Sequence, residues 1–328
     1  MVTEQIGHYV IESVIGSGGM ATVYKAFDQR IKRYVAVKML GEHFTNQDYL
    51  YDRFEQEAQL IAKLEHHAIV PVYDYGEYDN RPYIIMRLMN GGSLAERLED
   101  GPLDPAQGAA ILNRICSALD KAHAHGVIHR DIKPGNILFD EDGIAFLADF
   151  GIARFSELTQ SGMVVGSPHY MSPEQARGNP IDNRSDVYQL GVLLFEMLTA
   201  TLPFDGESID SVIYQHVHEP IPQLKSLNPS LPKKYQQVVE DAVMKDRDKR
   251  IPTALDLAAR FQELVDTESY SREMITPQKK FDHERDTLFD YPVKKERSGG
   301  TRLVLLLTIV VALFIGFFTI PAFRENPM

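Results

Sequence analysis

The segment His129-Arg130-Asp131-Ile132-Lys133-Pro134-Gly135-Asn136 is the most informative part of this 328-residue chain, together with Asp149-Phe150-Gly151, which begins 18 residues after Asp131. Asp131 can accept a hydroxyl proton, and Lys133 can neutralise developing negative charge. Asn136 and Asp149 can supply the hard oxygen ligands that Mg²⁺ prefers. Each residue alone could be an ordinary surface group. In this order and spacing they predict a catalytic, metal-binding site.

A glycine-rich segment lies upstream, in Gly16-Ser17-Gly18-Gly19-Met20-Ala21, between two strand-like runs. Glycines there let backbone N–H groups donate to phosphate oxygens, although glycines are also common in plain hairpins. Ala21 takes the third glycine position of a G-x-G-x-x-G pattern and no helix follows, so a dinucleotide site is not supported. Lys38 ends the run Val35-Ala36-Val37 and comes 22 residues after Gly16. On a neighbouring antiparallel strand, its ammonium would face the same phosphates.

A carboxylate that could orient this lysine follows 19 residues later, at Glu57. The surrounding pattern predicts a helix from about Asp48 to Leu64. Taken alone, Glu57 reads as part of a solvated helix face. Paired with Lys38, it is our choice over Glu55 for the orienting group.

The distribution of apolar residues changes near residue 90. Before it, runs rich in Val, Ile and Tyr predict strands at Tyr9–Ile15, Thr22–Ala26, Tyr34–Lys38, Ile69–Tyr73 and Tyr83–Leu88. After it, longer patterns predict helices at Pro105–His123, Ser185–Leu198, Lys233–Met244 and Thr253–Val265. We therefore expect an α+β domain over residues 9–265, with a small sheet-rich lobe at about 9–88 and a larger helical lobe at about 90–265.

Charge and cysteine content exclude some classes of protein. The net charge is −12, and residues 266–302 contain eight acids and eight bases, so the negative charge belongs to residues 1–265. Such a domain is not expected to bind nucleic acid, because phosphate-backbone binding needs positive charge. The single cysteine, Cys116, cannot form an intrachain disulfide and indicates a reducing compartment.

The C-terminal part of the chain differs from the rest. Residues 266–302 are charged and have no core of their own, which predicts a juxtamembrane linker. Residues 303–320 contain no charge, and the helix continued to Phe323 would be about 31 Å long, close to the thickness of a bilayer's hydrocarbon core. We expect a transmembrane helix at 303–323 that contacts membrane lipid. Residues 324–328 would form a short tail, too short for a sensor on the far side.

Basic residues predict the orientation of this span. Lys294, Lys295, Arg297 and Arg302 precede it, whereas Arg324 alone follows it. Flanks rich in Lys and Arg stay in the cytoplasm. We therefore expect a single-pass protein of the inner (plasma) membrane with residues 9–265 in the cytoplasm. The four basic residues that precede the span could also contact anionic lipid headgroups.

The motifs quoted above resemble those of the eukaryotic-like (Hanks-type) serine/threonine protein kinases, over essentially residues 9–265. The glycine turn, Val-Ala-Val-Lys, His-Arg-Asp-x-Lys-x-x-x-Asn and Asp-Phe-Gly are that family's set. Ser172-Pro173-Glu174 resembles its Ala-Pro-Glu, and Arg250 resembles the late arginine that pairs with this glutamate. The residues around the glycine-rich segment and around Ser172-Pro173-Glu174 look most like those of the bacterial, membrane-anchored kinases. The resemblance implies a bilobal protein kinase fold.

Roles for individual residues follow from this resemblance. Asp131, Lys133 and Asn136 would be catalytic, Asn136 and Asp149 would hold Mg²⁺ (or Mn²⁺ in its place), and Lys38, held by Glu57, would contact the phosphates of ATP. Met86 would be the gatekeeper beside the adenine, and His129 would pack beneath Phe150. The remaining nucleotide contacts would come from Ile15, Gly16, Ser17, Gly18, Gly19, Met20, Ala21, Thr22, Val23, Ala36, Arg87, Met89 and Leu138.

The resemblance also implies substrates and regulation. Lys133 and the segment Gly166–Tyr170 favour protein Ser/Thr hydroxyls as acceptors, with Ser167 bonding near Asp131 and Lys133. A phosphate on Thr159 or Ser161 could pair with Arg130 and order the loop that carries these two residues. In a homodimer, one copy of the chain could phosphorylate the other in trans. The alternatives are a membrane-tethered pseudokinase scaffold and a small-molecule kinase. The filled catalytic positions argue against the scaffold, and Ser-Pro-Glu argues against the small-molecule enzyme.

Overall fold

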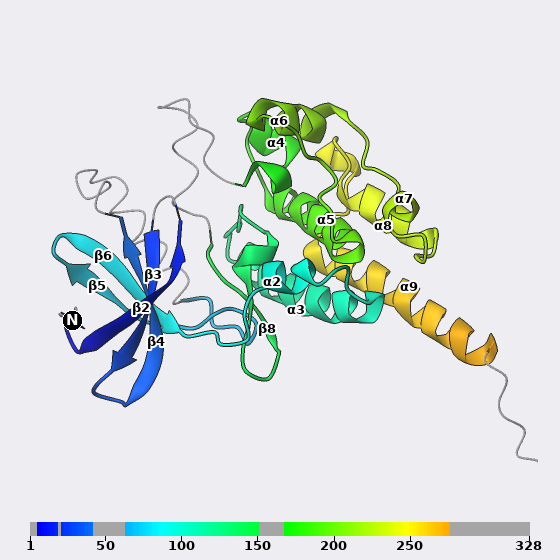
Figure 1. Ribbon diagram of the computed structural model, residues 1–328. Coiled ribbons are helices and arrows are strands. Elements are labelled where there is room, and N and C mark those ends of the chain that lie inside the picture. The colour runs from blue at the N-terminus through cyan, green and yellow to red at the C-terminus, as the bar shows by residue number, and fades with distance from the viewer. Residues whose placement is uncertain (1–4, 19–20, 42–62, 151–166, 276–328) are drawn as a thin grey trace, which may run out of the picture. The chain divides into compact units, whose positions relative to one another are not determined.

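The computed structural model describes residues 5–18, 21–41, 63–150 and 167–275. Its N-terminal part is one curled antiparallel sheet with strand order β1-β2-β3-β4-β6-β5 (Figure 1). The strands are β1 (Gln5–Ile6), β2 (Tyr9–Ser17), β3 (Ala21–Asp28), β4 (Arg33–Leu40), β5 (Val72–Tyr78) and β6 (Arg81–Arg87). This sheet matches the small lobe that the sequence predicts.

Strand β4 shows how alternation in the sequence positions a functional side chain. Val35, Val37 and Met39 are buried and pack with Ile6 and Tyr9 in one apolar cluster. Successive side chains of a strand point to opposite faces. Lys38, between Val37 and Met39, therefore points to the other face of the sheet.

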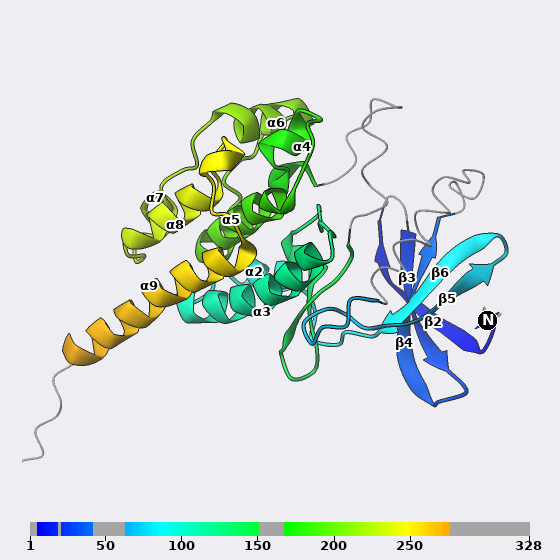
Figure 2. The same ribbon diagram turned by 180° about the vertical axis from the view of Figure 1, so that it is seen from behind.

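The C-terminal part is helical, with a short hairpin inserted in it. The helices are α2 (Leu94–Glu99), α3 (Pro105–Ala124), α4 (Pro173–Ala176), α5 (Asn183–Thr199), α6 (Ile209–His218), α7 (Leu224–Leu227), α8 (Lys234–Ala242) and α9 (Ala254–Ile275). The hairpin consists of β7 (Ile137–Phe139) and β8 (Ala145–Leu147). Helices α3 and α9 run side by side in both views (Figures 1 and 2).

Helix α5 forms the centre of the helical core. Fourteen of its seventeen residues are buried, including Tyr188 and Phe195. The helix starts where the Asp182 side chain accepts a hydrogen bond from the Arg184 N–H, a standard N-cap. The few polar residues in such a buried helix need partners inside the protein, and several of these partners belong to the site described below.

A buried ion pair between Arg250 and Glu174 also stabilises this part of the protein. The Arg250 guanidinium donates to both carboxylate oxygens of Glu174, at 2.8 and 3.1 Å. Ser185 Oγ also donates to Glu174, at 2.6 Å. The pairing that the sequence implied for Glu174 and Arg250 is thus present.

The boundaries differ from the predicted ones at two places. Strand β5 begins at Val72 and not at the predicted Ile69. Ile69 forms an isolated β-bridge with Leu147 of the hairpin and is not part of the sheet. Helix α9 continues to Ile275, ten residues beyond the predicted end of the domain. In this extension Glu268 forms an ion pair with Lys234 of α8, at 3.3 Å. The predicted helix around Glu57 lies outside the described residues.

Within the part of the chain that the structure describes, no helix has both the length and the apolar character needed to cross a bilayer. The predicted span at 303–323 and the linker residues 276–302 lie outside that part.

Candidate active site

Two side chains of the catalytic loop, Lys133 and Asn136, converge on the Asp131 carboxylate. Lys133 Nζ lies 3.0 Å from Asp131 Oδ2, and Asn136 Nδ2 donates to the same oxygen at 2.9 Å. Asn136 Nδ2 also donates to the Asp131 main-chain oxygen at 2.7 Å. Asp131 is nearly buried, with 5% of its surface exposed, so these contacts hold its carboxylate in one orientation.

The buried carboxylate of Asp186, on α5, fixes the start of this loop. It accepts hydrogen bonds from the backbone N–H groups of His129 and Arg130, both at 2.8 Å. His123 Nε2 lies 2.7 Å from it. Arg130 has a φ of +71°, a region that is unfavourable for residues with a Cβ. The hydrogen bonds from the loop to Asp186 help to compensate for this strain.

His129 lies under the loop that follows β8. Its ring centroid is 4.6 Å from that of Phe150, as expected from the sequence. Complete burial lowers the pKa of His129, so the ring is neutral at physiological pH. In the tautomer that donates from Nε2 to the Ala148 oxygen (3.0 Å), Nδ1 accepts the Asp131 N–H at 3.3 Å. His129 is therefore structural and not an acid or base.

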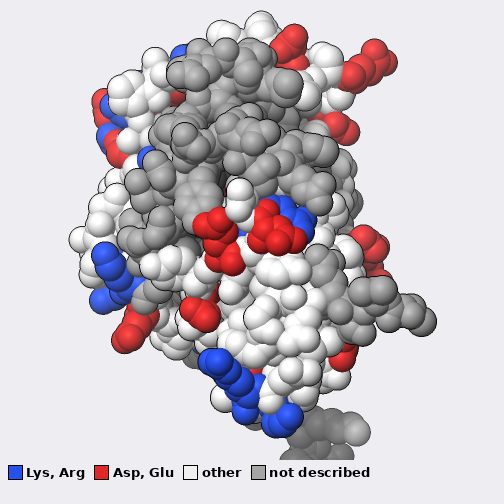
Figure 3. Space-filling model, turned by 90° about the vertical axis from the view of Figure 1, so that its left-hand side faces the viewer, with Lys and Arg blue, Asp and Glu red and all other residues white. Residues whose placement is uncertain are grey.

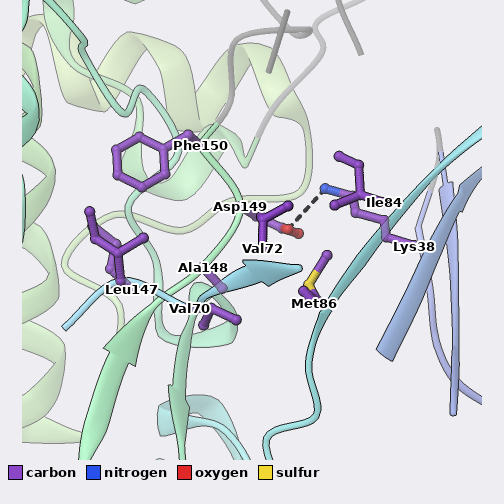
Figure 4. Close-up of a pocket in the computed structure, with 10 residues that line it drawn as sticks. Lys38, Val70, Val72, Ile84, Met86, Leu147, Ala148, Asp149 and Phe150 are labelled. Carbon is purple, nitrogen blue, oxygen red and sulfur yellow. Dashed lines mark hydrogen bonds and ion pairs between the residues drawn. The ribbon is translucent and has the colours of Figure 1, made fainter. Parts of the chain in front are cut away.

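An ion pair joins the sheet to the end of β8. Lys38 Nζ lies 2.9 Å from Asp149 Oδ1 (Figure 4). Asp149 has a φ of +55°, so its backbone is also held in the left-handed region. The pair borders a small cavity of about 20 Å³ that is lined by apolar side chains of both lobes, including Met86 and Phe150. Glu57, the predicted partner of Lys38, lies outside the described residues.

The residues predicted to contact a nucleotide lie around this ion pair. In the sheet register, Val23 is opposite Lys38 and Ala36 is opposite Met86. On the hairpin, Leu138 packs in one apolar cluster with Met86 and Met89. The apolar groups that could enclose a flat ring thus come from both the sheet and the hairpin.

The glycine turn is a hairpin, as predicted. Gly16 is opposite Val23 and Ser17 is opposite Thr22, while the Gly18 N–H donates to the Ala21 oxygen at 2.9 Å. Ile15 precedes the turn and is 49% exposed. Gly19 and Met20, at its tip, lie outside the described residues.

Arg87, next to Met86, forms hydrogen bonds through both its backbone and its side chain. Its N–H donates to the Pro71 oxygen at 3.0 Å and is therefore not available to a ligand. Its guanidinium donates to Asp140 Oδ2, beyond β7, at 3.2 Å. This contact was not predicted from the sequence.

The end of the segment 149–174, here called the activation segment, contacts the catalytic loop around Asp131. Lys133 Nζ donates to Ser167 Oγ at 2.9 Å, as the sequence predicted. Tyr170 donates to Glu196 at 2.5 Å, and burial raises the pKa of both groups. Thr159 and Ser161, the predicted phosphorylation sites, lie outside the described residues.

Two buried glutamines, Gln175 and Gln189, also contact this loop and were not identified from the sequence. Gln189 stands among apolar residues of α5, and a glutamine at a buried helical position needs internal partners. A glutamine within this apolar pattern could have identified Gln189 as a buried polar residue, but it could not have predicted which groups Gln189 contacts.

Comparison with known proteins identifies the family. The family model described as "Protein kinase domain" matches residues 9–262. The chain belongs to the protein kinase family. The family prediction is therefore confirmed, and the sheet and helical parts described above are the N-lobe and the C-lobe of a kinase domain.

Two bacterial kinases have sequences similar to this chain. The chain is 41% identical over 276 residues to serine/threonine-protein kinase PrkC of Bacillus subtilis, covering 83% of this chain and 43% of PrkC. It is 36% identical to PknL of Mycobacterium tuberculosis, covering 82% of this chain and 67% of PknL. The chain thus spans less than half the length of PrkC.

The fold is also found in solved kinase structures. The crystal structure of the Mycobacterium tuberculosis PknI kinase domain matches with a TM-score of 0.67 and 25% identity, covering 81% of this chain and 99% of PknI's domain. The predicted protein kinase fold is confirmed for the described residues.

The oxygen ligands of the site fit a magnesium ion. Among the described residues there is no cluster of three His, Cys, Asp or Glu side chains that could hold a metal alone. Mg²⁺ in kinase sites usually binds one or two protein oxygens and completes its shell with phosphates and water. Asp149 offers such an oxygen, and Asn136 uses its amide nitrogen for Asp131, so that its amide oxygen is the group able to ligate.

Proposed function

We propose that the chain is a serine/threonine protein kinase that transfers the γ-phosphoryl group of MgATP to protein hydroxyls. The observation that carries this proposal is the convergence of Lys133 and Asn136 on the Asp131 carboxylate, at 3.0 and 2.9 Å. Phosphoryl transfer depends mainly on positioning and charge stabilisation, and this cluster offers both. The kinase names of the similar proteins support it.

Each part of the site has a task in this reaction. Asp131 would accept the proton of the substrate hydroxyl, and Lys133 would stabilise the negative charge of the transferring group. Lys38 would bind the phosphates of ATP, and Asn136 and Asp149 would hold Mg²⁺. When bound, MgATP supplies the phosphoryl group and a further positive charge.

The position of Lys133 supports Ser/Thr acceptors over Tyr. Its ammonium bridges the Asp131 carboxylate and Ser167 Oγ, which ties the catalytic loop to the segment on which a substrate chain would lie. We infer protein substrates that present Ser or Thr to Asp131.

The direct test compares wild-type protein with Lys38→Met in MgATP and a generic basic protein. We expect Lys38→Met to lower phosphate incorporation by about 10²-fold or more, because the variant loses its phosphate contact and its ion pair with Asp149. Lys25→Met is the matched control. It lies on the neighbouring strand, where its ammonium pairs with Glu12 at 3.3 Å and lies 4.2 Å from the centre of the Tyr34 ring, and it should keep full activity. No incorporation above background by the wild type would favour the pseudokinase scaffold, and full incorporation by Lys38→Met would contradict the role of Lys38.

We also propose that the kinase regulates itself by phosphorylation of Thr159 or Ser161. Arg130 lies beside the catalytic base and offers a cation for such a phosphate. A second copy of the chain would supply the active site in trans. Mass spectrometry of the wild-type reaction above should find phosphate on these residues, and the Lys38→Met protein should lack it.

We further propose that residues 303–323 anchor the kinase in the inner membrane with its catalytic domain in the cytoplasm. The full-length protein should sediment with membranes and resist a high-salt wash, since an apolar span is not released by charge screening. A truncation after Ile275 should stay in the supernatant and keep its activity. It should end there and not at Val265 because α9 continues to Ile275.

Release of the full-length protein by salt alone would contradict the anchor. Digestion of the kinase domain by protease added outside intact cells would contradict its orientation.

A further inference from the structure

The two buried glutamines, Gln175 and Gln189, bind the backbone on both sides of Asp131. Only 5% and 2% of their surfaces are exposed. Gln189 comes from the second turn of α5, and Gln175 comes from α4, directly after the activation segment. They reach the same peptide from different helices.

Gln189 contacts the residues before and after the base. Its Oε1 accepts the Ile132 N–H at 2.9 Å, and its Nε2 donates to the Arg130 main-chain oxygen at 2.9 Å. One side-chain amide thus spans Asp131, holding one peptide group on each side of its Cα.

Gln175 contacts the same carbonyl group and Gln189 itself. Its Nε2 donates to the Arg130 oxygen at 3.1 Å, while its Oε1 accepts from Gln189 Nε2 at 3.2 Å and from the Ser172 N–H at 2.9 Å. The last contact belongs to the capping box that starts α4.

The partners fix the orientation of both amides. A backbone N–H can only donate and a carbonyl oxygen can only accept, so the contacts with Ile132, Ser172 and Arg130 determine which end of each glutamine is oxygen. In that orientation Gln189 uses both N–H groups and its oxygen, leaving none of its polar groups unsatisfied. A fully satisfied buried network holds its members rigidly.

This network completes the support of a strained backbone. Arg130 has a φ of +71°, and the contacts of Asp186 with this backbone are to the N–H groups of His129 and Arg130. The Arg130 oxygen and the Ile132 N–H are bound by the glutamines instead. Without them, each of the two peptide groups next to Asp131 would lose one hydrogen-bond partner, and the strained backbone could relax.

We propose that Gln189 is a positioning residue for the Asp131 carboxylate. We further propose that Gln175 links the position of this carboxylate to Ser172, at the start of α4 and the end of the activation segment. The proposal rests on the proposed kinase function. Neither glutamine touches Lys38, Asn136 or Asp149 in the contacts described, so both act on the base and not on the nucleotide.

The test uses the full-length chain and Gln189→Met, which keeps the length of the side chain and removes its hydrogen bonds. We expect kcat to fall by about 10- to 100-fold, since an error of about 1 Å in a reacting group can cost 10²-fold. The KM for ATP should change less than about 2-fold. Gln175→Met should have a smaller effect, and the double variant should lose less than the product of both losses, because both amides bind one carbonyl group.

Thr199→Val is the matched control. It removes buried hydrogen bonds to the Phe195 and Thr201 oxygens at the opposite end of the same helix. It should lower the melting temperature without changing kcat. A kcat of Gln189→Met no lower than that of Thr199→Val, or a matching rise in the KM for ATP, would overturn the positioning role.

Hydrogen exchange separates this inference from the function on which it rests. Peptides that contain the Ile132 amide should exchange at least about 10-fold faster in Gln189→Met than in wild type, whether or not the protein transfers phosphate. Inactive wild-type protein with this change in exchange would refute the kinase proposal alone. Unchanged exchange would refute the role of Gln189.

Discussion

Replacing Asp131 with Asn should lower kcat for phosphoryl transfer by about 10²- to 10⁴-fold, the usual contribution of a positioned general base. Asparagine keeps the shape of the side chain, and its oxygen can still accept from Lys133 and Asn136. It cannot take up the proton of the attacking hydroxyl. Single-turnover transfer to a Ser/Thr peptide measures the loss, and nucleotide titration should show affinity within about 2-fold of wild type.

Asp182→Asn controls for the loss of one carboxylate. Asp182 caps α5 and lies 2.7 Å from Arg184 in an ion pair, and asparagine is an equally good N-cap. This variant should fold and retain its activity. Unchanged turnover by Asp131→Asn would remove Asp131 from the reaction and with it the main support for the proposed function.

Replacing Arg250 with Met should lower the free energy of unfolding by about 3–5 kcal/mol, the range for breaking one partner of a buried ion pair. The Arg250 side chain is completely buried. It also donates to the main-chain oxygens of Met244 and Arg184, which would lose that partner. For a domain of this size the melting temperature should fall by about 6–20 °C.

The stability effect of Arg250→Met should depend on pH through the ionisation of Glu174. Burial by itself would raise the pKa of Glu174, but its hydrogen bonds from Arg250 and Ser185 hold that pKa below its ordinary value of 4.5. A carboxyl whose pKa is depressed by folding stabilises the native state above the unfolded pKa, and this stabilisation is lost as the pH falls below it. In Arg250→Met the unpaired, buried Glu174 should have a raised pKa.

The stability difference between wild type and Arg250→Met should therefore be greatest near neutral pH and shrink as the pH falls toward 4.5. Adding Glu174→Gln, which removes the unpaired charge, should restore part of the loss. Denaturant titration at several pH values measures both effects. A deficit that is independent of pH and is not reduced by Glu174→Gln would show that the ion pair is not its cause.

Most residues of the site were identifiable from the sequence because they lie in short motifs with fixed spacing. Asp131, Lys133 and Asn136 lie within six residues, and the structure brings them together. The Glu174–Arg250 pair was implied only by family resemblance, since its partners are 76 residues apart. The role of Glu57 and the sites Thr159 and Ser161 stay predictions.

The remaining features depend on tertiary contacts that no local pattern encodes. Ile69 is as apolar as a strand residue, but its neighbour in space is Leu147 of the hairpin, so the strand starts later. The polar residues after Val265 predict a linker, whereas contacts with α8 accompany the continued helix. Gln189 and Arg130 are 59 positions apart, and their contact depends on how α5 packs under the catalytic loop.

Surface charge was predicted only as a total. The net charge of −12 indicates an acidic protein. Figure 3 shows that acidic and basic side chains of the described residues both occur on the face in view, with no continuous basic surface there. The arrangement of charges on a surface follows from the fold and not from the sum.

The ion pair between Lys38 and Asp149 joins positions 111 residues apart. Closing so long a loop carries an entropic cost before the contact repays it, and chains rich in such distant contacts fold slowly. During synthesis, the N-lobe lysine leaves the ribosome long before the aspartate that it binds, and Arg250 follows later still. Phosphoryl transfer should therefore begin only after the chain has emerged beyond Arg250, so that a nascent kinase cannot phosphorylate its surroundings while it is being made.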